Sequence, residues 1–378
     1  MKRNMIKLGD VATYINGYAF KPEDRGEVGL PIIRIQDLTG NAYDLGFYNG
    51  DYPKRIEIND GDVLISWSAS LGVYVWNRGR ALLNQHIFKV EFDKVNIDKS
   101  YFVYAVRQKL AEMAMKTHGA TMKHIVKKDF EETLIPYPSQ KKQIEIGTNL
   151  DKIANIIAAR KQQLELLDEL VKARFVEMFG DCNNLISMED VCSIITDGTH
   201  QPPKFKESGI PFILVSNLSN NTITYNTEKY ISEETYSALY KRTPIEIGDL
   251  LLSTVGSYGH PAVVTEDTRF LFQRHIAYLK PKREIVNSFY LHSALLAPDG
   301  QRQIEEKIKG IAQKTLNLSE IRKIMIPVPE IEEQNEFADF VKRIDKSKVN
   351  YYYKNRKDGF PPLLFIYSVT TIINLSDY

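Results

Sequence analysis

The sequence predicts an α+β fold in which two homologous modules of mixed helix and strand are separated by long helices that pair as an antiparallel coiled coil. Two observations lead to this prediction. Short motifs of the first half recur in the same order in the second half, and a long amphipathic stretch without proline follows the first set of motifs. The length of 378 residues agrees, because a chain of this size usually divides into more than one domain.

The repeat is clearest in two glycine–aspartate segments, GDVLISWSASLG at 61–72 and GDLLLSTVGSYG at 248–259. Three further motif pairs keep the same order, with an offset that rises from 210 − 30 = 180 to 326 − 135 = 191. A slowly growing offset is typical of two homologous modules when the second has longer loops. We therefore expect modules at residues 1–138 and 182–329. The pairs are LPIIRIQDL at 30–38 with IPFILVSNL at 210–218, QHIF at 85–88 with RHIA at 274–277, and IPYP at 135–138 with IPVP at 326–329.

Each module is expected to combine short strands with a few helices. Aliphatic and β-branched runs that begin at the glycine–aspartate turns predict strands at 62–68 and 249–255. Helical periodicity after a serine that can act as an N-cap predicts helices at 100–116 and 288–308.

Residues 139–181 are predicted to form the first long spacer helix. Apolar residues recur there at alternating spacings of three and four, the pattern of a coiled-coil seam, and Arg160 and Arg174 share the same stripe. A helix of about 40 residues is roughly 60 Å long, so we expect a second helix to cover the stripe. The alternative is an ordinary amphipathic surface helix. The stripe comprises Ile146, Leu150, Ile153, Ile157, Leu164, Leu167, Val171 and Met178.

Residues 330–354 are predicted to form the second spacer helix, which looks truncated. The pattern deteriorates after Lys348 into a divergent tail at 355–378, where GFPP at 359–362 would stop a helix. The stripe from Leu164 onward is then expected to be exposed or covered by a partner. The matching apolar or uncharged positions of the second helix are Gln334, Phe337, Val341 and Ile344.

Composition excludes several classes of protein. Two cysteines argue against a disulfide scaffold, and the absence of a signal-peptide pattern or a long apolar run favours a cytoplasmic protein without a membrane span. The net charge of +1 is lower than expected for a protein that binds DNA unaided. Partners are therefore expected to supply most of the phosphate contacts.

Catalytic and metal-binding patterns are missing from the sequence. It contains no phosphate loop, dinucleotide-binding turn, HExxH or CxxC motif, and its histidines lack ligand spacing, so no metal site is predicted. Ser66, Ser70 and His86 could be combined with Asp62 into a hydrolase triad, but no GxSxG elbow surrounds the serines. We therefore expect no catalytic residue.

Two similar but unequal modules on a helix pair suit the reading of an asymmetric, split DNA site. Shared residues would build the framework and replaced ones would set specificity, with Lys and Arg anchoring phosphates and Gln, Asn, Arg and His reaching bases. For any one of these residues the alternative is a solvated polar loop. The candidates are Trp67, Ser70, His86, Thr121, Lys123, His124 and Lys127 in the first module, and His200, Lys204, Ser257, Tyr258, Arg274, Gln313 and Lys314 in the second.

These motifs resemble the specificity subunit of type I restriction–modification enzymes over residues 5 to about 348. The resemblance lies in LGDVATYINGYAF, LPIIRIQDL, GDVLISWSASLG, GATMKHI and IPYPSQKKQ, and in their counterparts ITDGTHQPPKF, GIPFILVSNL, GDLLLSTVGSYG and IPVPEIEEQ. Each motif is short, but their duplicated order is specific.

The resemblance implies two target-recognition domains that each read one half of a bipartite double-stranded DNA site, with antiparallel helices that set the gap. It implies that the subunit is not catalytic and binds no cofactor itself. Methyltransferase subunits, which use S-adenosylmethionine, and restriction/translocase subunits, which use ATP and Mg²⁺, would be its partners. The helix-pair and docking seam would comprise Ile153, Ile157, Leu164, Leu167, Phe337, Val341 and Ile344.

Two alternatives remain at this point. One is a non-catalytic protein–protein scaffold with duplicated domains, whose binding would be indifferent to DNA sequence and to substitution of Lys123, His124, Gln313 or Lys314. The other is a duplicated hydrolase that uses Ser66 or Ser253.

Overall fold

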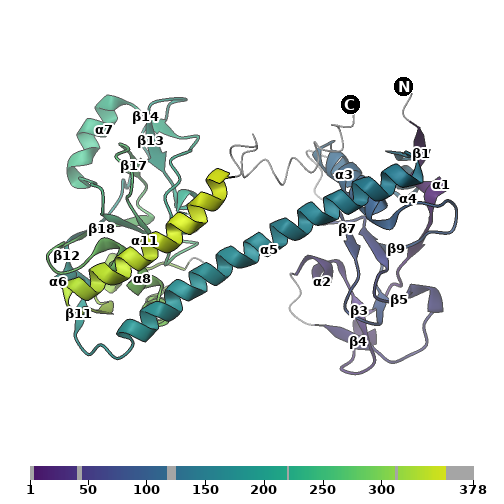
Figure 1. The fold of residues 1–378 in the computed structure, drawn as a ribbon, viewed down its shortest axis with the longest axis horizontal. Coiled ribbons are helices and arrows are strands. Elements are labelled where there is room, and N and C mark those ends of the chain that lie inside the picture. The colour runs from purple at the N-terminus through teal and green to yellow at the C-terminus, as the bar shows by residue number, and fades with distance from the viewer. Residues whose placement is uncertain (1–3, 41–44, 117–124, 219–220, 311–313, 355–378) are drawn as a thin grey trace. The chain divides into compact units, whose positions relative to one another are not determined.

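The computed structural model describes residues 4–40, 45–116, 125–218, 221–310 and 314–354. The chain forms two compact units whose boundary falls between Arg160 and Lys161, inside the long helix α5 (Gln140–Phe179) (Figure 1). We call the part that ends with β10 (Leu134–Pro136) the first domain, and the part from β11 (Leu185–Ser187) to β19 (Met325–Pro327) the second domain.

The first domain contains short strands, a few short helices and one long helix. Its elements are β1 (Met5–Lys7), α1 (Leu8–Val11), β2 (Thr13–Asn16), η1 (Pro22–Asp24), β3 (Leu30–Ile33), α2 (Ile35–Thr39), β4 (Gly46–Tyr48), η2 (Lys54–Ile56), β5 (Glu57–Ile58), β6 (Val63–Ser66), β7 (Gly72–Val75), β8 (Ala81–Leu83), β9 (Ile87–Glu91), α3 (Lys99–Lys116), α4 (Lys127–Glu131) and β10. An antiparallel sheet has the order β2-β9-β6-β7, and a mixed sheet has the order β4-β3-β8-β5 with β3 and β8 parallel. Strand β1 pairs with β10 and so ties the start of the domain to its end.

Strand β6 is buried on both faces, which explains its continuous apolar sequence. Val63 and Ile65 point into a core that includes Phe102 of α3, whereas Leu64 points into a second core beneath β8. Successive side chains of a strand alternate between faces, so a strand between two cores must be apolar throughout. The predicted strand at 62–68 is confirmed in its central part.

The second domain repeats this plan. Its elements are β11, α6 (Met188–Val191), β12 (Cys192–Asp197), β13 (Ile210–Ile213), η3 (Val215–Asn217), β14 (Tyr230–Ile231), α7 (Glu233–Leu239), η5 (Tyr240–Arg242), β15 (Leu250–Ser253), β16 (Pro261–Val263), β17 (Leu271–Phe272), β18 (Ile276–Pro281), α8 (Ser288–Leu296), α9 (Pro298–Lys307), α10 (Leu318–Ile321) and β19. The sheet β12-β18-β15-β16 corresponds to β2-β9-β6-β7, and the three-stranded sheet β14-β13-β17 corresponds to part of the mixed sheet.

Even the strand register is repeated. Ser66 lies opposite Ile87 in the first domain, and Ser253 lies opposite Ile276 in the second. These pairs have the offsets of 187 and 189 that the motifs give. The internal duplication is therefore confirmed at the level of single strand pairs.

The retained glycine and aspartate build the same turn in both domains. Gly61 and Gly248 have φ of 89° and 91°, a region that glycine enters without steric cost. Asp62 Oδ2 accepts a hydrogen bond from the Asn59 amide at 2.8 Å, and Asp249 Oδ2 accepts one from the Glu246 amide at 2.9 Å. The shared residues thus fix the entry into β6 and β15.

The helix predicted at 288–308 is two helices, α8 and α9. Pro298 is the first residue of α9, and Ala297 before it has an extended backbone. Proline has no amide hydrogen to donate and disfavours a helical residue before it, so it ends α8 and opens α9. The matching stretch of the first domain has no proline and forms the single helix α3.

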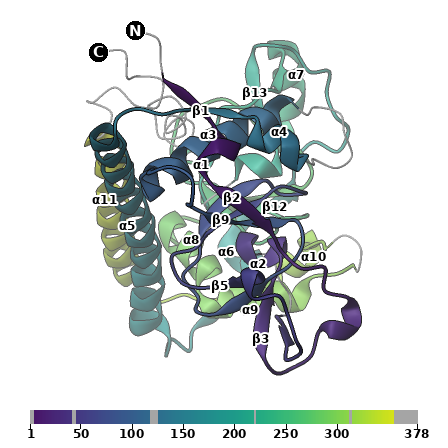
Figure 2. The same ribbon diagram turned by 90° about the vertical axis from the view of Figure 1, so that its right-hand side faces the viewer.

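The predicted spacer helix is continuous from Gln140 to Phe179. Helix α11 (Ile331–Lys354) lies beside its C-terminal part (Figures 1 and 2). The Phe337 ring is 5.6 Å from Phe179, and Lys348 Nζ is 2.6 Å from Asp168 Oδ1. Residue numbers rise along one helix as they fall along the other, so this pair is antiparallel. The tail at 355–378 lies outside the described residues.

At the C-terminal end of α5 the seam prediction is wrong for Arg174 and misses two buried residues. Phe175 and Phe179 are the buried residues there, at 4% and 3% exposure, whereas Arg174 pairs with Glu177 at 2.8 Å. Val171 and Met178 are half-buried at the edge of the same core. A strict seven-residue repeat drifts by about 20° per heptad on a straight helix, so over several heptads the buried face moves to the following residue.

Among the helices of the described residues, none combines the length and hydropathy needed to cross a membrane.

Candidate functional site

Three main-chain hydrogen bonds connect the same four segments in both domains. In the first domain the Gln85 amide donates to Tyr18 O at 2.9 Å, Trp67 to His86 O at 3.3 Å, and Ile125 to Trp67 O at 3.0 Å. These bonds join the loop after β2, the β8–β9 turn, the end of β6 and the chain before α4. The result is a row of loops at one end of the strands of the main sheet, which we call the loop row.

The second domain has the same loop row. The Arg274 amide donates to Thr199 O at 3.1 Å, Thr254 to His275 O at 3.0 Å, and Leu316 to Thr254 O at 2.8 Å. Trp67 and Thr254 therefore occupy equivalent places, as do His86 and His275. The framework is common to both domains, while the side chains it presents differ.

The first-domain candidates fall on this row as far as the structure describes them. Trp67 is half-buried, with its ring 4.9 Å from His86 and 5.6 Å from Phe88, and Ser70 is exposed beyond it. Lys127 donates from Nζ to Tyr14 O at 2.9 Å, which holds its ammonium group near the sheet edge. Thr121, Lys123 and His124 lie outside the described residues.

On the second loop row, Lys314, Tyr258 and Glu305 form a compact polar group. Tyr258 OH donates to Glu305 Oε2 at 2.6 Å, and Lys314 Nζ lies 3.3 Å from Tyr258 OH and 3.2 Å from Glu305 Oε1. These hydrogen bonds lower the pKa of the Glu305 carboxyl and raise the pKa of Lys314. Ser257 is exposed on the same turn, and Gln313 lies outside the described residues.

Arg274 and His200 extend the second loop row at its other end. Arg274 is exposed, and its Nε lies 3.4 Å from His275 Nε2. His200 Nε2 lies 2.8 Å from Asp197 Oδ2, and the other oxygen of Asp197 contacts Arg242. Lys204 is exposed on the same loop as His200. The loop row therefore brings together all second-domain candidates that the structure describes.

Sequence reasoning missed Arg242 and Asp197. They are 45 residues apart, so only the tertiary structure brings them together. One signal was available, because the dipeptide Lys-Arg occurs at 54–55 and again at 241–242, six residues before the glycine of each glycine–aspartate turn.

Neither serine considered as a nucleophile is accessible. Ser66 is fully buried and donates its hydroxyl to Ser70 O at 2.5 Å. Ser253 is 1% exposed, and its Oγ accepts from the His260 amide at 3.0 Å. Both hydroxyls stabilise the turn that follows their strand.

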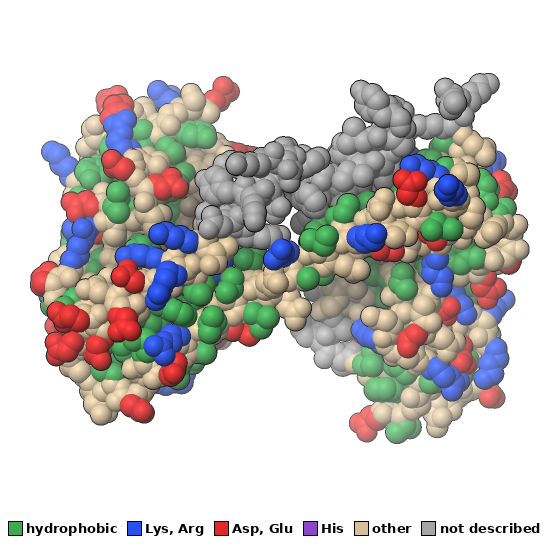
Figure 3. Space-filling view, in the orientation of Figure 1, with side chains coloured by type: hydrophobic (Ala, Val, Ile, Leu, Met, Phe, Trp, Pro, Cys, Tyr) green, Lys and Arg blue, Asp and Glu red, His purple; other side chains and the backbone are tan. Residues whose placement is uncertain are grey.

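Charges of both signs are mixed on the surface. On the face drawn in Figure 3, Lys and Arg side chains are interspersed with Asp and Glu, and hydrophobic side chains gather along α5. The exposed apolar residues of α5 are Ile144, Ile156, Ile157, Leu166, Leu170 and Val176.

The predicted helix-pair residues differ in their burial. Phe337 and Val341 are buried and Ile344 is half-buried on α11. On α5, Leu164, Leu167 and Ile153 are half-buried, while Ile157 is exposed. Thus the pairing is tight where α11 meets the last turns of α5.

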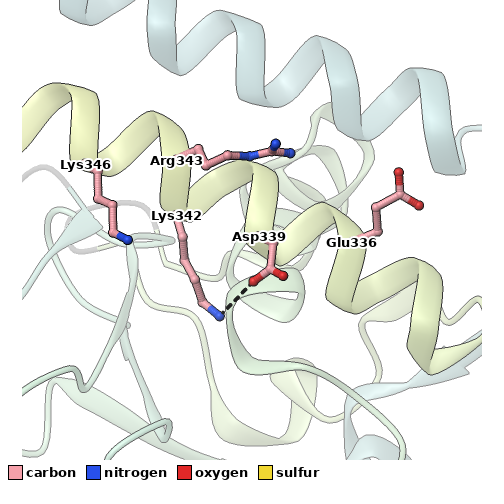
Figure 4. A pocket seen from close by; sticks show the side chains of 5 residues that line it. All are labelled: Glu336, Asp339, Lys342, Arg343 and Lys346. Atoms are coloured by element: carbon pink, nitrogen blue, oxygen red, sulfur yellow. Dashed lines mark hydrogen bonds and ion pairs between the residues drawn. The ribbon is translucent and has the colours of Figure 1, made fainter.

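The other side of α11 is charged. It carries a shallow hollow of about 440 Å³ lined by Glu336, Asp339, Lys342, Arg343 and Lys346 (Figure 4). Lys342 Nζ is 3.1 Å from Asp339 Oδ1.

Comparison with known proteins gives one consistent result. A family model described as a type I restriction modification DNA specificity domain matches residues 2–167 and again residues 184–352. The specificity subunit of the type I restriction enzyme EcoBI from Escherichia coli is 27% identical over 374 residues, which span 90% of this chain and 78% of that protein. The MjaVIII specificity subunit from Methanocaldococcus jannaschii is 22% identical, over 90% of this chain and 85% of its own.

The fold agrees with these relatives. The crystal structure of a type I restriction–modification S subunit from M. genitalium superposes with a TM-score of 0.53 at 14% identity, covering 98% of this chain and 94% of that chain. Two copies of the family domain, with the same internal order and register, account for most of the sequence. The chain therefore belongs to the type I restriction–modification DNA specificity family, and its role is to give such a system its DNA sequence specificity.

Proposed function

We propose that each loop row reads one half of a bipartite, asymmetric DNA site. The observation that carries this proposal is the shared backbone framework with different side chains upon it. At equivalent places of that framework the first domain has Trp67 and the exposed Gln85, and the second has Thr254 and the exposed Arg274. Identical modules would read a palindrome, whereas unlike modules in one chain read two unlike half-sites.

The side chains are of the types that such reading needs. Arg274, Lys314, Lys204 and Lys127 provide cations for phosphates and bases, and His200 and Ser257 can hydrogen-bond to base edges. The net charge of +1 and the mixed surface supply little general attraction for DNA. The remaining phosphate contacts come from partner subunits, so the chain alone binds DNA weakly.

The helices set the distance between half-sites and dock the methyltransferase subunits. Support comes from the continuous helix α5 and from the hydrophobic side chains exposed along it. The chain itself performs no catalysis in a cytoplasmic complex. Methyltransferase subunits use S-adenosylmethionine, and restriction/translocase subunits use ATP and Mg²⁺.

Mapping methylated bases in the host genome tests this function. Cells with the intact chain should carry a split, asymmetric motif that disappears when the chain is deleted and returns when it is restored. A continuous or palindromic motif, or methylation that persists without the chain, would contradict the proposal. If the chain instead binds other proteins in a way that does not depend on DNA sequence, the result would support the protein–protein scaffold.

A further inference from the structure

Arg242 is held by a single, largely buried carboxylate. Its Nη2 lies 2.5 Å from Asp197 Oδ1, and His200 Nε2 lies 2.8 Å from Asp197 Oδ2. The Asp197 side chain is 17% exposed, whereas those of Arg242 and His200 are 51% and 50% exposed. The Asp197 carboxylate thus orients the side chains of Arg242 and His200, which remain about half exposed to solvent.

These residues lie along a groove of the second domain. The groove has a volume of about 690 Å³, and its walls are the loop at 198–204 and the segment of α7 and η5 from 234 to 243. His200, Lys204 and Arg242 all contribute to its lining. The groove adjoins the second loop row, because Thr199 accepts the Arg274 amide.

The ion pair is better suited to orientation than to stability. A half-exposed pair contributes little to the free energy of unfolding. It does, however, fix the plane of a guanidinium group, whose fork of N–H donors can then match two acceptors at once. Within this trio both contacts of the guanidinium use Nη2, so the trio itself leaves Nε and Nη1 for a ligand.

The first domain has an arginine at the equivalent position, but a different residue at the position equivalent to Asp197. Counting six residues back from Gly61 and Gly248 makes Arg55 on η2 the counterpart of Arg242 on η5. Strand register makes Asn16 the counterpart of Asp197, since Asn16 lies opposite Phe88 and Asp197 opposite Ala277. We expect two modules to keep an arginine and differ at the position equivalent to Asp197 if both contact DNA through that arginine but bind different bases.

We propose that Arg242, positioned by Asp197, is a specificity-determining residue that donates two hydrogen bonds to the major-groove edge of a guanine in the half-site of the second domain. Guanine offers O6 and N7 as a pair of acceptors, and arginine is the side chain that most often reads them. A fixed guanidinium plane could also hold a phosphate through two hydrogen bonds, and the test below separates that contact from the reading of a guanine. This inference rests on the proposed function of the loop rows.

The test uses the chain assembled with the methyltransferase subunits of its host system. The complexes carry the intact chain, Arg242→Lys, Asp197→Asn or the control Arg269→Lys. Arg269 is also half-exposed and paired, with Glu233 at 2.7 Å, but it does not line the groove. Binding is measured on duplexes in which each guanine of the mapped motif is replaced in turn by 7-deazaguanine, which lacks the N7 acceptor.

The intact complex should lose affinity at one guanine of one half-site. Arg242→Lys should reduce the preference for guanine there by roughly 5- to 150-fold, with the other half-site unchanged. Asp197→Asn should reduce that preference less, without a change in unfolding midpoint. Arg269→Lys should behave as the intact chain.

Three results would overturn the inference. Arg242→Lys could weaken binding equally on all sequences with a smaller salt dependence, which identifies a phosphate contact. It could leave the guanine preference intact, or the second half-site could contain no guanine. If the intact complex itself shows no split motif, the proposed function fails as well, and that outcome is seen before any variant is compared.

Discussion

Replacing Phe337 with alanine is expected to destabilise the second domain by about 3–5 kcal/mol, the usual cost of removing a buried phenyl ring. Phe337 is fully buried, and its ring centroid lies 5.5 Å from Phe175, 5.6 Å from Phe179 and 6.2 Å from Tyr290. The ring joins α11 to α5 and α8, so no single side chain can fill the hole. For a urea dependence of about 2 kcal/mol/M, the midpoint should fall by about 1.5–2.5 M.

Intrinsic fluorescence can separate the two domains. The two tryptophans, Trp67 and Trp76, both lie in the first domain. Phe337→Ala should therefore shift part of the unfolding followed by far-UV circular dichroism and leave the tryptophan transition in place. Phe102→Ala is the matched control, because Phe102 is fully buried in the first domain and should shift the tryptophan transition instead.

Two outcomes would refute this reasoning. A loss below about 1 kcal/mol, typical of an average substitution, would mean that the aromatic cluster does not hold α11 against α5. Equal shifts of both signals in Phe337→Ala would mean that the two domains unfold as one unit.

Three further predictions concern two buried or paired carboxylates and the length of α5. Asp249→Ala should cost about 2–4 kcal/mol by the same urea titration, because the Asp249 side chain is 1% exposed and its Oδ2 accepts hydrogen bonds from the Tyr278 hydroxyl and the Glu246 amide, which lose that acceptor together. Asp62→Ala, at 26% exposure, should cost about 1–2 kcal/mol. Hydrogen bonds from Arg80 and Tyr52 lower the pKa of Glu57 from 4.5 to about 2, so this stabilisation should be full above pH 4.5 and fade towards pH 2. The tryptophan midpoint of Glu57→Gln should depend less on pH there, and an equal dependence would exclude Glu57 as its source. Seven residues inserted after Arg160 lengthen α5 by about 10 Å, so the methylated motif should gain up to about three base pairs between unchanged half-sites; altered half-sites would contradict a spacer role.

Sequence reasoning succeeded where motifs coincide with strands. The glycine–aspartate turns, the paired strands and their offsets are local features, so the repeat in sequence became a repeat in register. The length of α5 was also predictable, because neither proline nor a cap interrupts 140–179.

The predictions that failed depend on helix geometry and on contacts between segments that are far apart in sequence. Phe175 and Phe179 lie on the buried face, beside the predicted Val171 and Met178, because a straight helix does not keep a seven-residue period. The contact between Arg242 and Asp197 depends on how the last residue of β12 meets η5, which no local pattern encodes. The residue types on the loop row were predictable, but their mutual contacts were not.

Exchange of one domain tests the central claim most directly. Residues 1–138 are replaced by the corresponding domain of a relative with a different motif, and the methylated sites of the host are mapped. The account predicts that one half-site changes to that of the donor while the other half-site and the gap stay the same. A change in both half-sites, or in neither, would contradict it.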